Sequence, residues 1–287
     1  MELVIGASGY IGKEFCRYFS EKKKPFLGTY FSHEEKGMEF LDLKDPDLRR
    51  LKTDLTQVSH AFICSGMAKI DDCKKYEDKS FKINILGTER IIEQCFNFNI
   101  LPVFLSSDAV FDGKKGNYSE SDRTNPITVY GEQKKTIEDF LVKQEKDFFI
   151  ARLSKVFGVS KEDNSFLSSW KQDLKAGKEI YCATDNILSF TYVKDLVQVI
   201  DLALEKNLRG LYNIASPKSY SRFELATILK SKLAIGSGKI TPCFLNDFDF
   251  LEKRPLNTSL NCEKIIKDTE FNFSRIEDLI DRINCYE

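Results

Sequence analysis

Histidine is nearly absent from this chain of 287 residues, which contains only His33 and His60. The eight cysteines are scattered and form no CxxC pair, so the ligand clusters that bind structural zinc are missing. We therefore expect no metal site, and we expect the cysteines to remain reduced thiols.

An excess of one charge sign is also missing, because 43 basic residues face 44 acidic ones and leave a formal net charge of -1. Such a chain has no general attraction to nucleic acid or to an anionic membrane, so neither is an expected partner. No apolar run approaches the roughly 20 residues of a membrane-spanning helix, and the start MELVIG lacks the regions of a signal peptide. The sequence therefore predicts a cytoplasmic protein that holds any anionic ligand by local contacts.

The first half of the chain contains a regular alternation of β-rich runs and helical patterns. Strands are predicted at 3–5, 25–30, 38–41, 60–64, 103–107 and 148–153. Helices are predicted at 11–19, 81–98 and 127–144. This alternation is typical of a parallel sheet covered by helices on both faces, which is the doubly wound α/β architecture.

The second half follows a looser pattern and predicts a smaller mixed α/β lobe. Helices are predicted at 165–176, 193–206, 221–233, 260–267 and 274–284, and strands near 187–192, 211–215 and 240–244. We expect a main domain at 1–158 and a substrate-binding lobe at 159–287, with segments near 187–206 returning to the main domain. The polar loop 112–125 is interpreted either as plain surface or as a lid.

A glycine-rich turn, VIGASGYIG at 4–12, joins the first predicted strand to the first predicted helix. Gly6 allows the tight turn, Gly9 lets the backbone approach a pyrophosphate, and Gly12 allows close packing of helix on sheet. The helix N-terminus adds free N–H groups and the positive end of its dipole. The spacing is GxxGxxG and departs from the GxGxxG fingerprint, yet in this context it predicts dinucleotide binding rather than a purely structural turn.

The end of the second predicted strand bears on the choice of coenzyme. An NAD-dependent protein usually places a carboxylate there against the ribose 2′-hydroxyl. Here the sequence reads GTYFSH, and the first carboxylate is Glu34. Ser32 and His33 can hydrogen-bond a 2′-phosphate and Lys36 adds positive charge, so NADP(H) is favoured and NAD(H) is the alternative.

A tyrosine precedes a lysine by four positions twice, at Tyr18 and Lys22 and again at Tyr130 and Lys134. The first pair lies on the first predicted helix beside an apolar stripe, so packing is its expected role. The second pair lies in a helix that Asn125 is expected to cap, which places the two side chains one turn apart on one face.

Six motifs occur in the order found in one enzyme superfamily. They are GASGYIG (6–12), ICSG (63–66), NILGT (84–88), LSSDAVFDG (105–113), YGEQK (130–134) and RLSKVFG (152–158). Over nearly the whole chain this set resembles the extended short-chain dehydrogenases/reductases, which implies a Rossmann-type main domain. The later RPLNTSL (254–260) is similar to the dTDP-4-dehydrorhamnose reductase branch, which reduces 4-keto groups of nucleotide-linked deoxysugars.

The resemblance implies catalytic roles for three residues. Tyr130 matches the proton donor and Lys134 its partner, whose ammonium is expected to lower the phenol pKa from about 10 and to hold the nicotinamide ribose. Ser107 matches the residue that hydrogen-bonds the substrate carbonyl. Ser106 is the adjacent alternative, and strand alternation lets only one of the two serines face the site.

The resemblance also implies a coenzyme site assembled from several loops. Its residues are Gly6, Ser8, Gly9, Tyr10, Ile11, Gly12, Tyr30, Ser32, His33, Asp42, Leu43, Cys64, Ser65, Gly66, Asn84, Tyr130, Lys134 and Leu153. Asn84 is interpreted either as a support of the active site or as a helix cap. Ser107, Lys155 and Arg254 are expected to bind the substrate, Arg254 by pairing with its diphosphate, although a surface role for Arg254 is the alternative.

These observations favour an NADPH-dependent reductase of a nucleotide-linked 4-keto deoxysugar. One alternative is a nucleotide-sugar epimerase or dehydratase that recycles bound NAD. Another is a non-catalytic NADP-binding regulatory subunit, similar to the β subunit of methionine adenosyltransferase. Relatives of this fold often pair through long helices, so we expect a homodimer formed through 81–98 and 127–144.

Overall fold

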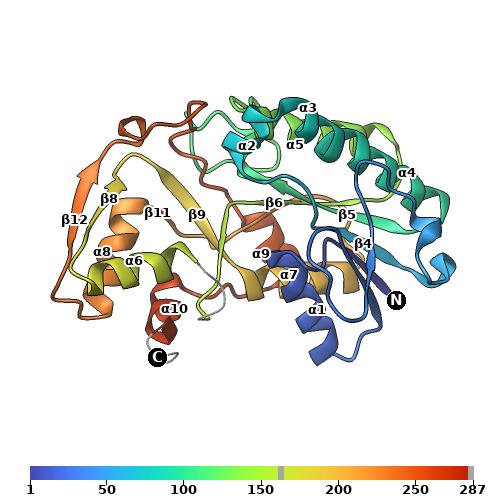
Figure 1. Ribbon diagram of the computed structural model, residues 1–287, viewed down its shortest axis with the longest axis horizontal. Coiled ribbons are helices and arrows are strands. Elements are labelled where there is room, and N and C mark those ends of the chain that lie inside the picture. Colours follow the sequence, from blue (N-terminus) through green and yellow to red (C-terminus); the bar gives the residue numbers. More distant parts are fainter. Residues whose placement is uncertain (161–164, 284–287) are drawn as a thin grey trace.

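A seven-stranded sheet forms the centre of the computed structural model, which describes residues 1–160 and 165–283 (Figure 1). Its order is β10-β6-β5-β4-β1-β2-β3, and every neighbouring pair is parallel. The strands are β1 (Glu2–Ile5), β2 (Phe26–Tyr30), β3 (Met38–Phe40), β4 (His60–Ile63), β5 (Leu101–Ser107), β6 (Phe149–Leu153) and β10 (Gly210–Ile214). The order reverses between β1 and β4, so the predicted doubly wound architecture is confirmed.

Helices cover both faces of this sheet (Figure 1). One face carries α2 (Ile70–Lys75), α3 (Glu77–Phe81), α4 (Thr88–Asn97) and α5 (Val129–Lys143), and the other carries α1 (Tyr10–Glu21), α7 (Val193–Glu205) and α9 (Glu263–Thr269). Successive strand residues point to opposite faces of the sheet, so the hydrophobic core has two parts. Leu3 and Ile5 pack with Ile91 on one face, and Val4 packs with Phe15 on the other. No helix in the described part of the chain is long and apolar enough to cross a membrane.

The helix predicted at 81–98 is interrupted in the structure. The π-helical turn Lys82–Gly87 joins α3 to α4. A side chain at Gly87 would place its Cβ 2.0 Å from the Leu43 carbonyl oxygen, so glycine lets this turn approach the loop after β3. Turns of this kind frequently accompany functional sites.

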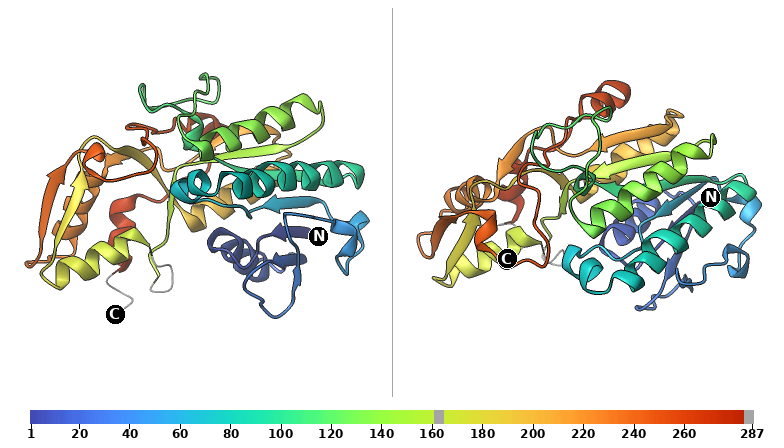
Figure 2. Two further views of the ribbon diagram at one scale, coloured as in Figure 1. Left: turned by 45° about the horizontal axis from the view of Figure 1, so that its top comes forward. Right: turned by 90° about the horizontal axis from the view of Figure 1, so that it is seen from above.

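A smaller lobe lies beside the sheet and extends away from it (Figure 2). It contains a three-stranded sheet, β11-β9-β7, and a two-stranded sheet, β12-β8. Its elements are β7 (Lys155–Phe157), α6 (Phe166–Lys175), β8 (Glu179–Ala183), β9 (Ile187–Tyr192), β11 (Ser219–Ser221), α8 (Arg222–Lys232), β12 (Lys239–Cys243) and α10 (Ile276–Ile283). The segment near 187–206 divides between the two parts, because β9 belongs to the smaller lobe and α7 packs against α1.

Three of these strands, β7, β8 and β11, have no counterpart among the sequence predictions. They are three to five residues long, and their sequences KVF, EIYCA and SYS contain no continuous apolar run that would mark a buried strand. Predicted residue 284 of the last helix and Cys285 lie outside the described residues.

Candidate active site

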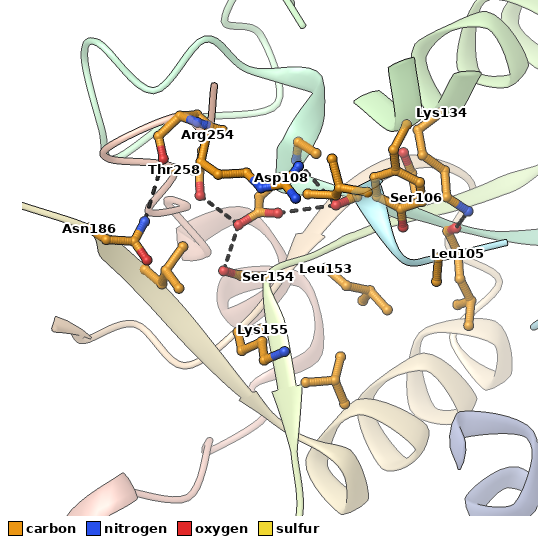
Figure 3. Close-up of a pocket in the computed structure, with 18 of the residues that line it drawn as sticks. Leu105, Ser106, Asp108, Lys134, Leu153, Ser154, Lys155, Asn186, Arg254 and Thr258 are labelled. Atoms are coloured by element: carbon orange, nitrogen blue, oxygen red, sulfur yellow. Dashed lines mark hydrogen bonds between the residues drawn. The ribbon is translucent and has the colours of Figure 1, made fainter. Parts of the chain in front are cut away.

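A cavity of about 720 Å³ opens between the carboxyl edge of the main sheet and the smaller lobe (Figure 3). Its walls come from the ends of β4, β5 and β6, from α5, from the smaller lobe and from the segment 245–258. Ligands of open α/β sheets bind outside the carboxyl ends of the strands, and this volume suits a small molecule.

The N-terminus of α5 places Tyr130 and Lys134 on the wall of the cavity. Thr128 caps this helix, because its hydroxyl accepts a 3.1 Å hydrogen bond from the Gly131 N–H. The prediction that Asn125 is the cap was wrong, since Asn125 donates its side-chain amide within the preceding loop and the helix begins four residues later.

Glycine at position 131 lets α5 approach the turn that follows β5. A Cβ there would lie 2.1 Å from the Ala109 carbonyl oxygen, a separation that requires the backbone to move. This close approach brings Tyr130 beside Ser107, whose hydroxyl acts to lower the Tyr130 pKa.

A carboxyl group stands behind Ser107. Asp108 accepts hydrogen bonds from Ser107 at 3.1 Å, from Ser154 at 2.8 Å and from Thr258 at 2.7 Å (Figure 3). Burial raises the pKa of Asp108 above its ordinary value, and the three hydroxyl donors oppose that rise. Sequence reasoning did not assign Asp108 a role, because its partners come from distant parts of the chain.

Ser106 is engaged elsewhere. Its hydroxyl donates a 2.5 Å hydrogen bond to Glu138, which also forms a buried ion pair with Arg152 at 2.6 Å. The expectation that only one of the two serines faces the site was wrong, because both line the cavity. The choice of Ser107 stays a prediction, and it is favoured because the Ser106 hydroxyl is bound to Glu138.

Burial is the main cause of the pKa shifts of Tyr130 and Lys134. It raises the pKa of Tyr130, against the opposing effect of the Ser107 hydroxyl, and it lowers the pKa of Lys134 to about 8. The Lys134 ammonium donates to the Leu105 carbonyl at 2.7 Å and lies 5.7 Å from the Tyr130 ring centre. The expectation that Lys134 would lower the Tyr130 pKa below its ordinary value was wrong, because burial raises that pKa.

The glycine turn fits a dinucleotide. Gly6 has a φ of 84°, and a side chain on it would lie 2.7 Å from the Ser65 side chain. Gly9 occupies the N-cap of α1, where no side chain caps the helix and no acidic residue lies in the first turn. The buried Ser65 hydroxyl has no hydrogen-bond partner among residues 1–160 and 165–283. An uncapped helix N-terminus and an unsatisfied hydroxyl suit a bound diphosphate.

The end of β2 leaves no free carboxylate for a ribose 2′-hydroxyl. Glu34, the first acidic residue after this strand, faces the Tyr30 hydroxyl, whose pKa is raised by desolvation and by this carboxylate. The exposed Ser32 and His33 side chains contact each other at 2.8 Å. This arrangement is compatible with a 2′-phosphate.

Asn84 lies on the π-helical turn and supports the loop after β4, which lines the cavity. Its side chain accepts from the Met67 N–H at 2.7 Å and donates to the Met67 carbonyl at 2.9 Å and to Gln133 at 2.7 Å. These bonds tie the loop after β4 to α5, so the alternative of a helix cap is excluded. Gln133, which sequence reasoning missed, directly precedes Lys134.

Arg254 lines the cavity but already has an acidic partner. Its guanidinium lies 2.6 Å from the Asp71 carboxylate, and the Arg254 side chain is 12% exposed. Nearby, Glu252 accepts the Val129 N–H at 3.0 Å. The segment 245–258 is thereby fastened to α2 and α5.

The loop 112–125 does not form a lid in this structure, because none of its residues lines the cavity. Tyr118 stacks on Phe111 with ring centres 4.1 Å apart and pairs with Leu260 in a β-bridge. The loop is held against the segment 257–261.

The predicted site residues fall into two groups. Those that line the cavity are Ile11, Cys64, Ser65, Gly66, Ser107, Tyr130, Lys134, Leu153, Lys155 and Arg254. The others do not line the cavity, and they lie near the ends of β1, β2 and β3, at the start of α1 and on the π-helical turn. They are Gly6, Ser8, Gly9, Tyr10, Gly12, Tyr30, Ser32, His33, Asp42, Leu43 and Asn84. Sequence reasoning missed Asn186 and Arg222, which also line it.

The doubly wound sheet, the glycine turn and the Ser107, Tyr130 and Lys134 constellation together define an extended short-chain dehydrogenase/reductase. More specifically, the family model described as the RmlD substrate binding domain matches residues 1–284, and the chain belongs to this family.

Solved structures and a curated relative agree with this assignment. A hypothetical dTDP-4-dehydrorhamnose reductase from Sulfolobus tokodaii has 30% identity and a TM-score of 0.82, covering 96% of this chain and 98% of its own. The Bacillus anthracis dTDP-4-dehydrorhamnose reductase, solved with NADP, has 22% identity and a TM-score of 0.85, covering 100% and 99%. The Bacillus subtilis spore coat polysaccharide biosynthesis protein SpsK is 28% identical over 79% of this chain and 77% of its own.

Proposed function

We propose that the protein is an NADPH-dependent reductase that acts on the 4-keto group of a nucleotide-linked deoxysugar. The observation that carries this proposal is the convergence of Ser107, Tyr130 and Lys134 on one wall of a cavity at the carboxyl edge of the sheet. The dTDP-4-dehydrorhamnose reductases among its structural neighbours support the same reaction class.

NADPH, when bound, supplies the hydride that reduces the keto carbon. Tyr130 donates its phenolic proton to the carbonyl oxygen as that oxygen becomes an alkoxide, and the raised pKa keeps this proton in place until then. Ser107 exchanges its bond to Asp108 for one to the carbonyl oxygen, because Asp108 retains Ser154 and Thr258 as donors. The Lys134 ammonium holds the nicotinamide ribose hydroxyls.

The coenzyme choice rests on the end of β2 and on the glycine turn. The exposed Ser32 and His33 and the engaged Glu34 favour a 2′-phosphate over a 2′-hydroxyl. The neighbour from Bacillus anthracis, which was solved with NADP, supports this choice.

The cavity also suits an anionic substrate. Within the described part of the chain it is lined by four basic side chains and by a single carboxyl group, that of Asp108, although the whole chain carries a net charge of -1. The basic residues are Lys134, Lys155, Arg222 and Arg254. A nucleotide-linked sugar brings the negative charge that this lining attracts.

Two further features belong to the proposal. Seven cysteines of the described residues are free, which suits a reducing cytoplasm. A homodimer is proposed through the segments 81–98 and 127–144, which form the π-helical turn with α4 and the helix α5, and where Phe81, Leu86 and Val142 are exposed.

The test is coenzyme oxidation, followed by absorbance, with a panel of nucleotide-linked 4-keto-6-deoxysugars and with NADPH and NADH in parallel. We expect turnover with at least one sugar and a higher kcat/KM for NADPH. Tight NADPH binding without turnover on any sugar would instead support the regulatory-subunit alternative.

A further inference from the structure

Tyr130, Lys134 and Glu138 are spaced four positions apart on α5, so they lie on successive turns of one face of this helix. That face packs against the end of β5. The Lys134 ammonium donates to the Leu105 carbonyl at 2.7 Å (Figure 3), and Glu138 accepts a hydrogen bond from the Ser106 hydroxyl at 2.5 Å. Of the three helix residues, Glu138 alone does not line the cavity.

Arg152 holds the Glu138 carboxylate in place. The Nε and Nη2 atoms of Arg152 donate to its two oxygens at 3.0 and 2.6 Å, which is the bidentate geometry of a strong ion pair. The two side chains are only 4% and 5% exposed. Arg152 is the partner of Ser106 in the parallel register of β5 and β6, so this one carboxylate binds both strands. Its position below the active site is therefore fixed from two sides.

Glu138 is also the carboxylate that acts on Lys134. Burial lowers the Lys134 pKa, and the negative charge of Glu138 opposes that fall. The Lys134 ammonium is also influenced by Cys73 on α2 and by Cys64 after β4. Burial raises the pKa of both thiols, to about 11 for Cys73, and it raises the pKa of the Tyr130 phenol. These three groups are therefore uncharged at neutral pH.

We propose that Glu138 is a positioning residue of the active site, whose buried carboxylate fixes the end of β5 against α5 and supplies a counter-charge for Lys134. This inference rests on the proposed function, in which the Lys134 ammonium holds the nicotinamide ribose. Without the Glu138 charge, Lys134 loses its proton at a lower pH, and the coenzyme loses a ligand. An ion pair that only packed α5 onto the sheet would leave the titration of Lys134 unchanged.

The test is the titration of Lys134, followed by NMR of the full chain with isotope-labelled lysine Cε carbons. Lys134→Met identifies the signal, and in the wild type we expect a pKa of about 8. Glu138→Gln keeps the shape of the side chain and removes its charge, so the Lys134 pKa should fall by about 1 or more. Partial unfolding would have the opposite effect, because water would return the Lys134 pKa toward its ordinary value of 10.5.

A second variant covers the stability of the fold. Glu138→Gln leaves the Arg152 charge unpaired in the core, which is destabilising. The double variant Glu138→Gln with Arg152→Met removes this charge too, and its Lys134 pKa should also fall, by a smaller amount. Glu132→Gln is the matched control, because Glu132 is an exposed residue of the same helix that does not line the cavity. It should leave the Lys134 pKa and the Kd for NADPH unchanged.

Coenzyme binding should follow the same titration. In Glu138→Gln, the Kd for NADPH should begin to rise about one pH unit lower than in the wild type. The inference is overturned if neither folded variant has a lower Lys134 pKa than the wild type. Because the lysine titration needs neither coenzyme nor sugar, a lowered Lys134 pKa in a protein that reduces no sugar would refute the proposed reaction alone.

Discussion

At the scale of single residues, the same tyrosine–lysine spacing has two different roles, which depend on where each pair lies in the fold. Tyr18 and Tyr130 each precede a lysine by four positions. The Tyr18 hydroxyl lies 3.0 Å from the buried Asp201 carboxylate on α7, which is a packing role. Tyr130 instead meets Ser107 on the wall of the cavity.

Replacing the two tyrosines tests this distinction. Tyr130→Phe should lower the turnover number by about 10²- to 10⁴-fold, because the proton donor is lost, while NADPH affinity stays largely intact. Tyr18→Phe is the matched control and should keep its turnover, although losing the Asp201 contact lowers its melting temperature. Steady-state kinetics and NADPH titrations check both variants, and wild-type turnover in Tyr130→Phe would remove this residue from the mechanism.

The protonation state of Lys134 should make the affinity for NADPH depend on pH. Its pKa is lowered to about 8, so the ammonium that we propose as a ligand of the coenzyme is present below that pH and lost above it. The Kd for NADPH should therefore rise as pH increases above about 8, approaching tenfold per unit.

Fluorescence titrations of NADPH from about pH 6.5 to about pH 9.5 measure this dependence. Lys134→Met is the control, and it should bind NADPH more weakly with no rise in Kd across that range. A wild-type Kd that is constant through about pH 9 would contradict the assigned role.

At the scale of elements, the sequence predicted all seven strands of the main sheet and missed β7, β8 and β11 of the smaller lobe. Apolar runs such as those of β4, β5 and β6 are visible because both faces of a parallel sheet are covered. The π-helical turn depends on a partner outside the local sequence, the carbonyl oxygen of Leu43.

The approach of α5 to the β5 turn is the most sensitive of these contacts. Gly131→Ala places a methyl group where the Ala109 carbonyl lies, so α5 must shift and carry Tyr130 away from Ser107. We expect a loss of about 1–3 kcal/mol in the free energy of unfolding and a fall in kcat of about tenfold or more. Urea unfolding and steady-state kinetics measure the two effects.

Gly236→Ala is the control for this substitution, because a Cβ at Gly236 meets no atom within 4 Å. It should leave both quantities near their wild-type values. If Gly131→Ala retained wild-type stability and kcat, the close approach of α5 would not matter for the site.

At the scale of the whole molecule, the cavity is formed by segments that are far apart in the chain. Arg222 and Asn186 come from α8 and from the start of β9, and Thr258 comes from the segment that crosses between the two parts. A single sequence reveals motifs whose residues are close together in the chain, such as the glycine turn and the pair Tyr130 and Lys134. It does not show which distant polar residues meet, so Arg222 and the Asp108 cluster emerged only from the structure.

The proposed homodimer is also a property at this scale. Size-exclusion chromatography with light scattering should give twice the chain mass of 33.0 kDa. Leu86→Glu and Val142→Glu place charges on the exposed faces of the π-helical turn and α5, so they should shift the protein toward the monomer. A wild-type mass of one chain would contradict the dimer.

The central claim is that a hydride adds to C4 of a nucleotide-linked keto sugar while Tyr130 protonates the oxygen. The most direct measurement uses NADPH that carries deuterium at the transferred position, with mass spectrometry and NMR of the sugar product. We expect one deuterium at C4 for each NADPH oxidised, and labelled product that forms about 10²- to 10⁴-fold more slowly with Tyr130→Phe. An isomerised sugar formed without net NADPH oxidation would contradict this claim and identify an epimerase.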